Sequence, residues 1–297
     1  MTGRWPSAVG VCTWIYGDRD LSYVAGRLAA LGMDGAEIFV DPARCDPVRL
    51  RQVFDGHGLR LFSCTPHNVD LAHPEPRVRE AALRYYCQLV DLAADAGIEA
   101  VTCHEYIEPE AHLRPRASAA GPGDDAGSEP PSRGDGDRSD TAVLDRLAAS
   151  CRQIARRAAE VGVTVAYEPL SPGLVRCVRT AAEAMALAGA VDSTAFKIVL
   201  DSYHMHRSET DPAAAIRRCG DRLFALQVAD STRGAIGSGE IDFPAQLREL
   251  AAIDFTGPVI LECTTLPGPG RGTLADEAAL ETALRASRTW LTRRPAD

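Results

Sequence analysis

Four polar residues stand at the ends of four apolar runs in the second half of the chain, and together they can hold a metal ion. The runs are VGVTVAYE, AFKIVLD, RLFALQ and GPVILE, which end at Glu168, Asp201, Gln227 and Glu262. Three carboxylates and one amide oxygen form a hard ligand set, which suits Mn²⁺ or Mg²⁺ better than Zn²⁺. Mn²⁺ is the first choice, with Mg²⁺, Co²⁺ or Zn²⁺ as alternatives. Such a cation would polarise a carbonyl, ease loss of the adjacent proton and stabilise the enediolate.

Side-chain alternation predicts that these four residues share one face. Successive strand residues point to opposite faces, so Val163, Val165 and Tyr167 lie opposite Glu168. The other three runs divide in the same way, with the polar residue on the less bulky side. A single polar residue after a strand more often marks the point where the chain reaches water. Four in matching phase favour the interior of a barrel.

Proton transfer also requires a base near the cation. Glu168 and Glu262 come from non-adjacent runs, so they can flank a substrate, each with one carboxylate oxygen free for acid or base chemistry. His204 follows Asp201 by three residues in DSYHMH, and on a tight turn it would lean back to bind a substrate hydroxyl or oxyanion. Arg233, in the loop after the seventh predicted strand, would reach a substrate oxygen. A histidine bonded to its own loop and a surface arginine are the alternatives.

The first half of the chain adds candidates for the wall of the pocket. His104 shares strand phase with Ala100 and Thr102, and Trp14 shares phase with Gly10 and Cys12. Both are predicted to point inward and to contact a substrate, although an inward tryptophan is more often packing. Glu37, in the second strand, is a candidate for an acid that supports the ligands.

Strand ends so far apart in sequence need a fold that brings them together. Apolar runs alternate with helix-sized segments along the whole chain, eight of each, which predicts an α/β fold, a single (β/α)₈ TIM barrel over residues 1–297. In such a barrel the strand ends converge on one mouth. The predicted strands cover 8–14, 35–39, 59–64, 98–103, 163–168, 196–201, 223–228 and 259–262.

One segment departs from this alternation. Residues 114–140 contain no Val, Ile, Leu, Met, Phe, Trp, Tyr or Cys and are rich in Gly, Pro, Ser and Asp. Such a composition cannot bury enough apolar surface to offset the entropy of ordering. We predict a disordered, low-complexity insertion after the fourth strand, and favour an inert expansion over a lid.

Composition limits the functional classes. The chain has 297 residues, 45% of them hydrophobic, and a formal net charge of −9, which argues against a nucleic-acid partner and favours a small uncharged one. No run is long enough to span a membrane, and MTGRWPSAVG lacks a signal-peptide core. We therefore expect a soluble, cytoplasmic protein that does not associate with membranes. Nine cysteines without a CxxC pair are expected to be reduced. Homo-oligomerisation stays open.

The motifs VAYEPL, LDSYHMH, LQVADSTRGAIGSGEIDF and ILEC jointly resemble the xylose-isomerase-like sugar phosphate isomerase/epimerase family of (β/α)₈ barrels. The resemblance implies a divalent metal at the four strand ends, acid–base roles for the two glutamates and substrate contacts from His204 and Arg233. Many members have His where this chain has Gln227, whereas hydroxypyruvate isomerases are similar in having Gln. Ketose 3-epimerases extend EPL with Asn-Arg and a later Glu, but this chain continues EPLSPGL, which argues against a strict tagatose or allulose epimerase.

Three functions are compatible with these residues. The leading hypothesis is a metal-dependent isomerase or epimerase that moves a proton next to the carbonyl of an unphosphorylated sugar, ketose or small hydroxy-ketone in carbohydrate metabolism. The second is a dehydratase, a lyase that begins with the same proton abstraction on a keto-cyclitol or keto-sugar and then expels a β-hydroxyl. The third is a non-catalytic sugar-binding or partner protein on a decayed barrel, against which intact Glu168 and Glu262 argue.

Overall fold

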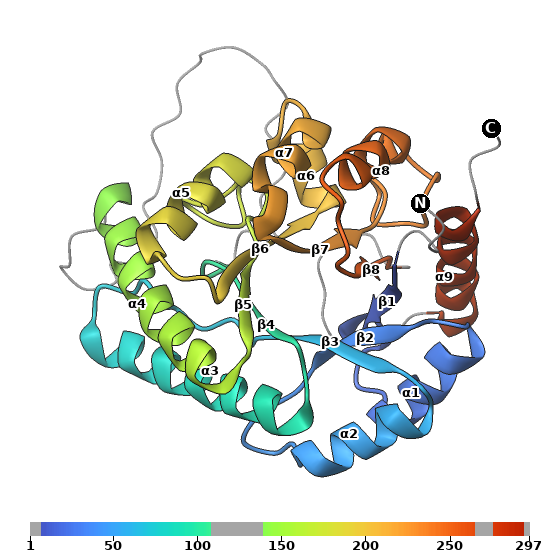
Figure 1. Cartoon of the computed structure of the whole chain (residues 1–297), viewed down its shortest axis with the longest axis horizontal. Helices are drawn as coiled ribbons and strands as arrows, with labels where there is room; N and C mark the ends of the chain where they lie inside the picture. The colour runs from blue at the N-terminus through green and yellow to red at the C-terminus, as the bar shows by residue number, and fades with distance from the viewer. Residues whose placement is uncertain (1–6, 108–138, 265–275, 294–297) are drawn as a thin grey trace, which may run out of the picture.

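Eight parallel strands close into a barrel in the computed structural model, which describes residues 7–107, 139–264 and 276–293 (Figure 1). The strands follow one another in chain order around the barrel, and Val9 pairs with Val259 where the first meets the last. The fold prediction is thereby confirmed. The strands are β1 (Val9–Cys12), β2 (Gly35–Phe39), β3 (Arg60–Thr65), β4 (Ala100–Cys103), β5 (Thr164–Tyr167), β6 (Phe196–Asp201), β7 (Leu223–Val228) and β8 (Val259–Leu261).

Helices surround the barrel on its outside (Figure 1). They are α1 (Leu21–Ala30), α2 (Pro47–Gly56), α3 (Pro76–Ala96), α4 (Asp140–Val161), α5 (Ala181–Val191), α6 (Ser202–Ser208), α7 (Pro212–Cys219), α8 (Phe243–Ala252) and α9 (Glu277–Thr292), with 3₁₀ turns η1 (Thr13–Tyr16) and η3 (Gly220–Arg222). The last helix packs beside the first, where Arg27 Nε donates to Glu281 Oε1 at 2.5 Å. Glu281 is only 9% exposed, whereas the Arg27 side chain is 41% exposed, so the ion pair lies at the edge of the interface between the two helices.

Local signals in the sequence explain where several helices begin and end. Thr180 and Glu183 form a capping box, in which each side chain accepts the other residue's backbone N–H at the start of α5. Asp46 caps α2 ahead of Pro47 in the first turn. Gly162 ends α4 in the left-handed conformation at φ 76°, which glycine adopts without a steric penalty.

Two hydrophobic layers hold the barrel. The larger one lies between the strands and the surrounding helices, and the smaller one fills the interior. Phe62 fills space beside β1 and β2, since a Cβ at Gly10 or Gly35 would approach its ring to 2.6–2.7 Å. The interior layer consists of Ala8, Cys12, Phe62, Ala100, Ala166, Val199, Ala225 and Ile260.

Several strand ends differ from the predicted bounds by one or two residues, and three differences affect the region around the strand ends. The first strand ends at Cys12 rather than residue 14, because the chain turns into η1. The segment after Asp201 is the helix α6 and not a tight turn, so it adds a helix to the eight expected. The predicted insertion lies outside the described residues over 114–138, whereas Ser139 and Asp140 cap and begin α4.

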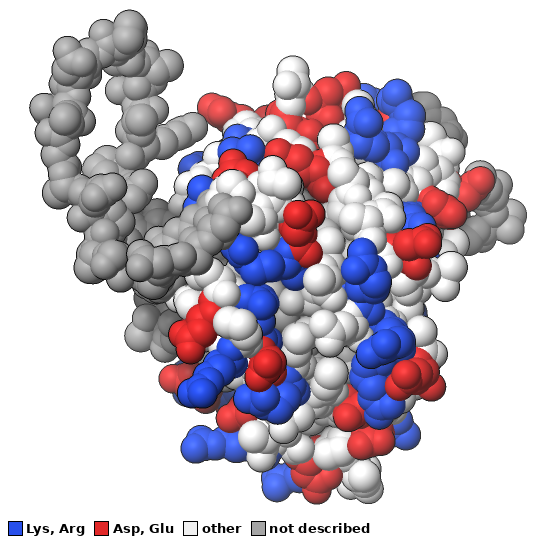
Figure 2. Space-filling view, turned by 90° about the vertical axis from the view of Figure 1, so that its left-hand side faces the viewer, with Lys and Arg blue, Asp and Glu red and all other residues white. Residues whose placement is uncertain are grey.

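Basic and acidic side chains are mixed on the face that Figure 2 shows. Among the described residues, Arg157 and Asp91 form an ion pair at 2.7 Å. Within the described ranges, no helix combines the length and apolarity that crossing a membrane requires.

Candidate metal centre and active site

The four predicted strand-end residues lie together at the carboxyl ends of β5 to β8. Asp201 ends β6 and is paired in register with Gln227 of β7, while Glu168 and Glu262 directly follow β5 and β8. Asp201, Gln227 and Glu262 are 1%, 2% and 7% exposed. The residues two positions earlier in each strand all belong to the interior layer, so the four share the inward phase. Those residues are Ala166, Val199, Ala225 and Ile260.

Arg233 is the positive charge at the centre of this group. Its Nη1 donates to Asp201 Oδ2 at 2.8 Å and to Glu262 Oε2 at 3.0 Å, and its guanidinium lies 4.3 Å from the centre of the Tyr203 ring. The other oxygens of these carboxylates accept from the His204 backbone N–H at 3.0 Å and from Trp14 Nε1 at 2.9 Å. Both carboxylates are therefore held in one orientation by donors on two sides.

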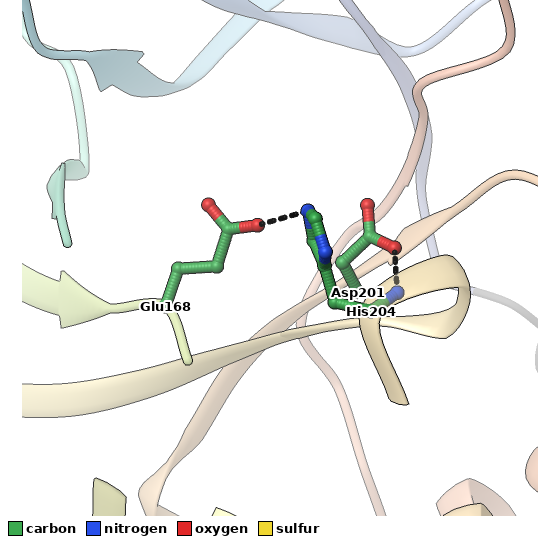
Figure 3. A group of neighbouring side chains, drawn as sticks. All are labelled: Glu168, Asp201 and His204. Carbon is green, nitrogen blue, oxygen red and sulfur yellow. Dashed lines mark hydrogen bonds and ion pairs between the residues drawn. The ribbon is translucent and has the colours of Figure 1, made fainter. Parts of the chain in front are cut away.

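His204 projects from the first turn of α6 toward Glu168, as Figure 3 shows. One oxygen each of Glu168 and Asp201 and one ring nitrogen of His204 lie within 4.8 Å of one another. Arg233 Nη2 can only donate and lies 3.0 Å from His204 Nε2. On the other side of the ring, the Ser171 backbone N–H donates to Nδ1 at 3.2 Å, and Ser171 Oγ lies 2.6 Å from the same nitrogen. Donors therefore face both ring nitrogens, which disfavours the doubly protonated ring.

Burial and mutual repulsion shift the acidities of the clustered carboxyl groups. Burial raises the pKa of Glu168 well above its ordinary value, and the nearby Glu262 and Asp201 raise it further. Burial likewise raises the pKa of Glu262 to about 8, against the opposing effect of Arg233. Burial also disfavours ionisation of Asp201, but Arg233 and His204 outweigh it and lower its pKa to about 2. Both glutamates thus hold their protons more tightly than ordinary carboxyl groups, as acid–base catalysts often do.

The donor set fits a hard divalent cation. Gln227 Oε1 is buried and accepts no hydrogen bond within the described part of the chain. The Glu168 carboxylate has a contact of 3.8 Å with His204 Nε2, which is beyond hydrogen-bonding distance. Unpaired oxygens next to Asp201 and Glu262 are the kind of ligand that Mn²⁺ or Mg²⁺ takes. A cation would also relieve the repulsion among these carboxylates.

The loop between β7 and α8 holds Arg233 in place. The buried Asp230 carboxylate accepts backbone N–H groups from Ser231, Gly237 and Ile241 at 2.7, 2.8 and 3.2 Å. Arg233 itself has a left-handed backbone with φ 63°, an uncommon conformation for a residue with a side chain. Such conformations persist where the surroundings fix them, and they concentrate at functional sites.

The remaining predicted residues have different positions. Trp14 lies in η1 rather than in a strand, but its indole N–H still reaches Glu262. His104 follows β4, is 4% exposed, and its Nδ1 lies 2.7 Å from the Glu105 carbonyl oxygen. Its charged form would disfavour protonation of His204. His104 is therefore close enough to His204 for their charges to interact, and its contact with a substrate stays a prediction.

Sequence reasoning missed three residues that shape the site. Ser171 contacts His204, Tyr203 underlies Arg233, and Asp230 organises the loop of Arg233. All three lie inside motifs quoted above: Ser171 in EPLSPGL, Tyr203 in LDSYHMH and Asp230 in LQVADSTRGAIGSGEIDF. Because their roles depend on which side chain they contact, only proximity to those motifs could have indicated them.

His204 is expected to remain neutral across the physiological pH range. Burial lowers its pKa from 6.5 to about 3, with Arg233 adding to the shift and Asp201 opposing it. In the unfolded chain this histidine binds a proton below about pH 6.5, whereas in the folded protein it binds one only below about pH 3. The free energy of unfolding therefore decreases as the pH drops from about 6.5 toward 3.

Denaturant unfolding of the wild type and His204→Asn at pH 7 and about pH 5 measures this contribution. The wild type should lose up to about 1.4 kcal/mol more per pH unit below 6.5 than the variant. NMR of the ring should show no titration above about pH 5. Equal pH dependence of the two proteins would contradict a buried neutral histidine.

The chain belongs to the xylose isomerase-like TIM barrel family, whose sequence profile matches residues 25–293. It is 24% identical over 245 residues to a ketose 3-epimerase of Arthrobacter globiformis, a match that covers 82% of this chain and 77% of the relative. It is also 31% identical over 129 residues to a 3-dehydroshikimate dehydratase of Pseudomonas aeruginosa, covering 39% of this chain and 20% of the relative.

A solved structure has the same fold. The D-psicose 3-epimerase of Clostridium cellulolyticum H10, crystallised with D-tagatose, aligns with a TM-score of 0.79 at 22% sequence identity. The alignment covers 96% of this chain and 98% of the epimerase. The barrel architecture is therefore shared over nearly the whole length of both chains.

Proposed function

We propose that this protein is a divalent-metal-dependent epimerase or isomerase of a ketose or related keto-sugar. The observation that carries the proposal is the pair Glu168 and Glu262, two glutamates from non-adjacent strands with raised pKa values that border the same cluster of carboxylates. A raised pKa brings the titration of a carboxyl group closer to neutral pH, which favours its use as an acid and a base. The similarity to a ketose 3-epimerase over most of both chains supports the same reaction class.

The residues of the chain divide the work of a proton transfer next to a carbonyl. Glu168 and Glu262 serve as base and acid on the two sides of the substrate, so that a proton removed by one can be returned by the other. Arg233 donates to the oxygen on which negative charge develops, since a guanidinium has donors and a fixed charge. His204, beside Glu168 and Arg233, contacts a substrate hydroxyl or oxyanion. A hard cation held by Glu168, Asp201, Gln227 and Glu262 would supply Lewis-acid polarisation of the carbonyl.

The test is a substrate screen with Mn²⁺-loaded protein in D₂O, followed by NMR. Ketoses, keto-sugars and keto-cyclitols should be included without phosphate groups. We expect deuterium at the carbon next to the carbonyl together with net formation of an epimer or isomer. Absence of both exchange and conversion over the whole panel would overturn the proposal.

The dehydratase relative supports one alternative outcome. Loss of a β-hydroxyl after the same proton abstraction would produce an enone with ultraviolet absorbance instead of an isomeric sugar. Recording absorbance during the same screen separates the two reactions. Binding of a sugar without exchange or conversion would instead favour a non-catalytic protein.

A further inference from the structure

A buried chain of hydrogen bonds across three strands fixes the side chain of Gln227. Gln227 Nε2 of β7 donates to Glu37 Oε1 of β2 at 2.8 Å, and Ser63 Oγ of β3 donates to Glu37 Oε2 at 2.6 Å. Glu37 and Ser63 are 1% and 0% exposed. Because an ionised carboxylate only accepts hydrogen bonds, the NH₂ end of the Gln227 amide is the end that can face Glu37.

The other end of the same amide carries an unsatisfied acceptor. Gln227 Oε1 is buried and, among the described residues, accepts no hydrogen bond, although buried polar groups are usually paired. Rotating the amide by half a turn would place this oxygen against the Glu37 carboxylate. Both groups only accept hydrogen bonds, so they would repel each other. The unpaired oxygen is thus a consequence of Glu37, and it lies on the strand neighbouring that of Asp201.

Glu37 itself is less suited to bind a cation than to orient a ligand. Both of its oxygens already accept short hydrogen bonds from the neutral donors Gln227 and Ser63. It belongs to β2, on the side of the barrel away from Glu168 of β5 and Asp201 of β6. A carboxylate that fixes the orientation of a metal ligand through that ligand's N–H group commonly raises metal affinity 10–100-fold.

We propose that Glu37 is a positioning residue that turns the Gln227 amide so that Oε1 faces the carboxylate cluster, making residue 227 an oxygen ligand for a hard divalent cation. The inference rests on the proposed metal site and specifies how the chain builds its neutral ligand. It also predicts a preference, because an oxygen in this place favours Mn²⁺ or Mg²⁺ over Zn²⁺.

Glu37→Gln tests the proposal through metal affinity measured without substrate. A glutamine at residue 37 can both donate and accept, so it no longer selects one orientation of Gln227. We expect isothermal titration of the chelator-treated protein with Mn²⁺ to show about 10–100-fold weaker binding than in the wild type. Glu281→Gln removes another largely buried carboxylate, which lies on α9 and pairs with Arg27 of α1, and it should leave the Mn²⁺ affinity unchanged.

A double-mutant cycle separates positioning from the loss of one negative charge. Gln227→Leu removes the oriented amide. If Glu37 acts through Gln227, adding Glu37→Gln to this variant should change the Mn²⁺ affinity by no more than about twofold. An equal loss in both backgrounds would mean that Glu37 acts by its charge alone, and would overturn the proposal.

A second variant keeps the test decisive if Glu37→Gln folds poorly. In Gln227→His, the ring can donate one N–H group to Glu37 and offer its other nitrogen to the cation. We expect the ratio of Zn²⁺ to Mn²⁺ affinity to rise at least about tenfold, since imidazole is a softer ligand than an amide oxygen. An unchanged ratio would show that residue 227 does not contact the cation.

The outcomes distinguish this inference from the proposed function. If the wild type binds Mn²⁺ and Glu37→Gln binds it equally well, the positioning role fails and the function is unaffected. If the affinities change as expected but the substrate screen shows no exchange, the function fails and the positioning role stands. A wild type that binds no divalent cation would overturn both.

Discussion

Glu262→Gln should stop net epimerisation while leaving part of the proton exchange intact. If Glu168 and Glu262 serve opposite sides of the substrate, losing one removes abstraction from one epimer only. The other epimer should still exchange its proton with solvent through Glu168. We expect kcat/KM for conversion to fall about 10²–10⁴-fold, the usual contribution of a positioned acid or base.

The measurement is deuterium exchange of each epimer separately in D₂O, with conversion followed in the same samples. Glu168→Gln should give the mirror-image pattern, with exchange retained in the other epimer. Exposed Glu240, on the loop of Arg233, provides a matched control, and Glu240→Gln should behave as the wild type. Loss of exchange from both epimers in both variants would contradict a division into two faces and favour a single base.

The role of Glu262 in the architecture of the site needs to be measured beside its chemistry. Its carboxylate accepts from Trp14 Nε1 and Arg233 Nη1, and an amide in its place would turn its NH₂ toward one of these donors. Trp14→Phe removes the indole hydrogen bond to Glu262 and leaves the hydrogen bond from Arg233 to Glu262 in place. Because one hydrogen bond contributes about 1 kcal/mol, this variant should lose less than about tenfold in kcat/KM.

Removing divalent cations with a chelator should abolish conversion and lower the melting temperature. A cation that binds only the folded protein stabilises it by about 4 kcal/mol at a free concentration a thousand times the dissociation constant. In this site the gain has an electrostatic origin, because Glu168, Asp201 and Glu262 repel one another in a buried pocket. Scanning calorimetry of chelated and Mn²⁺-loaded protein measures the shift.

The stabilisation by the cation should increase with pH. A cation binds the ionised carboxylates, and the pKa of Glu262 is raised to about 8, so a proton must leave before it can serve as a ligand. Mn²⁺ affinity should therefore rise from about pH 6 to about 8 and level off above it. Over the same range the chelated protein should lose stability, because ionising a carboxyl group whose folded pKa is raised destabilises the fold.

Two controls make this result specific. Asp201→Asn should lose most of the Mn²⁺-dependent gain in melting temperature, whereas Glu240→Gln should keep it. A melting temperature that does not respond to Mn²⁺ at any pH would contradict a metal centre at the ends of β5 to β8.

Much of the fold was predictable because it depends on local patterns. The strands of residues 35–39, 196–201 and 223–228 were predicted with the bounds that the structure has. Apolar runs bounded by Gly, Pro and capping residues specify such elements without reference to the rest of the chain. The helix α6 was missed because its seven residues lack an apolar period, and its start depends on the Asp201 side chain that caps it.

The candidate site was predictable to the extent that it follows from strand phase. Alternation placed Glu168, Asp201, Gln227 and Glu262 on one face, and barrel closure brought that face together. Which atoms contact one another was not predictable. The bonds of Arg233 to Asp201 and Glu262 join residues about thirty positions apart, and their geometry depends on a left-handed backbone in a loop that Asp230 holds.

The sequence by itself therefore determined the class of architecture and the types of ligand, since both are encoded in the order and period of residues. Tertiary structure decided the chemistry of each group. Packing removed water from both Glu262 and His204. It thereby raised the pKa of Glu262 to about 8 and lowered the pKa of His204 to about 3. It also placed Glu37, 190 positions away in sequence, against the amide of Gln227 and so selected which end of that amide is free to bind. Such effects depend on desolvation and distance, which exist only after the barrel has closed.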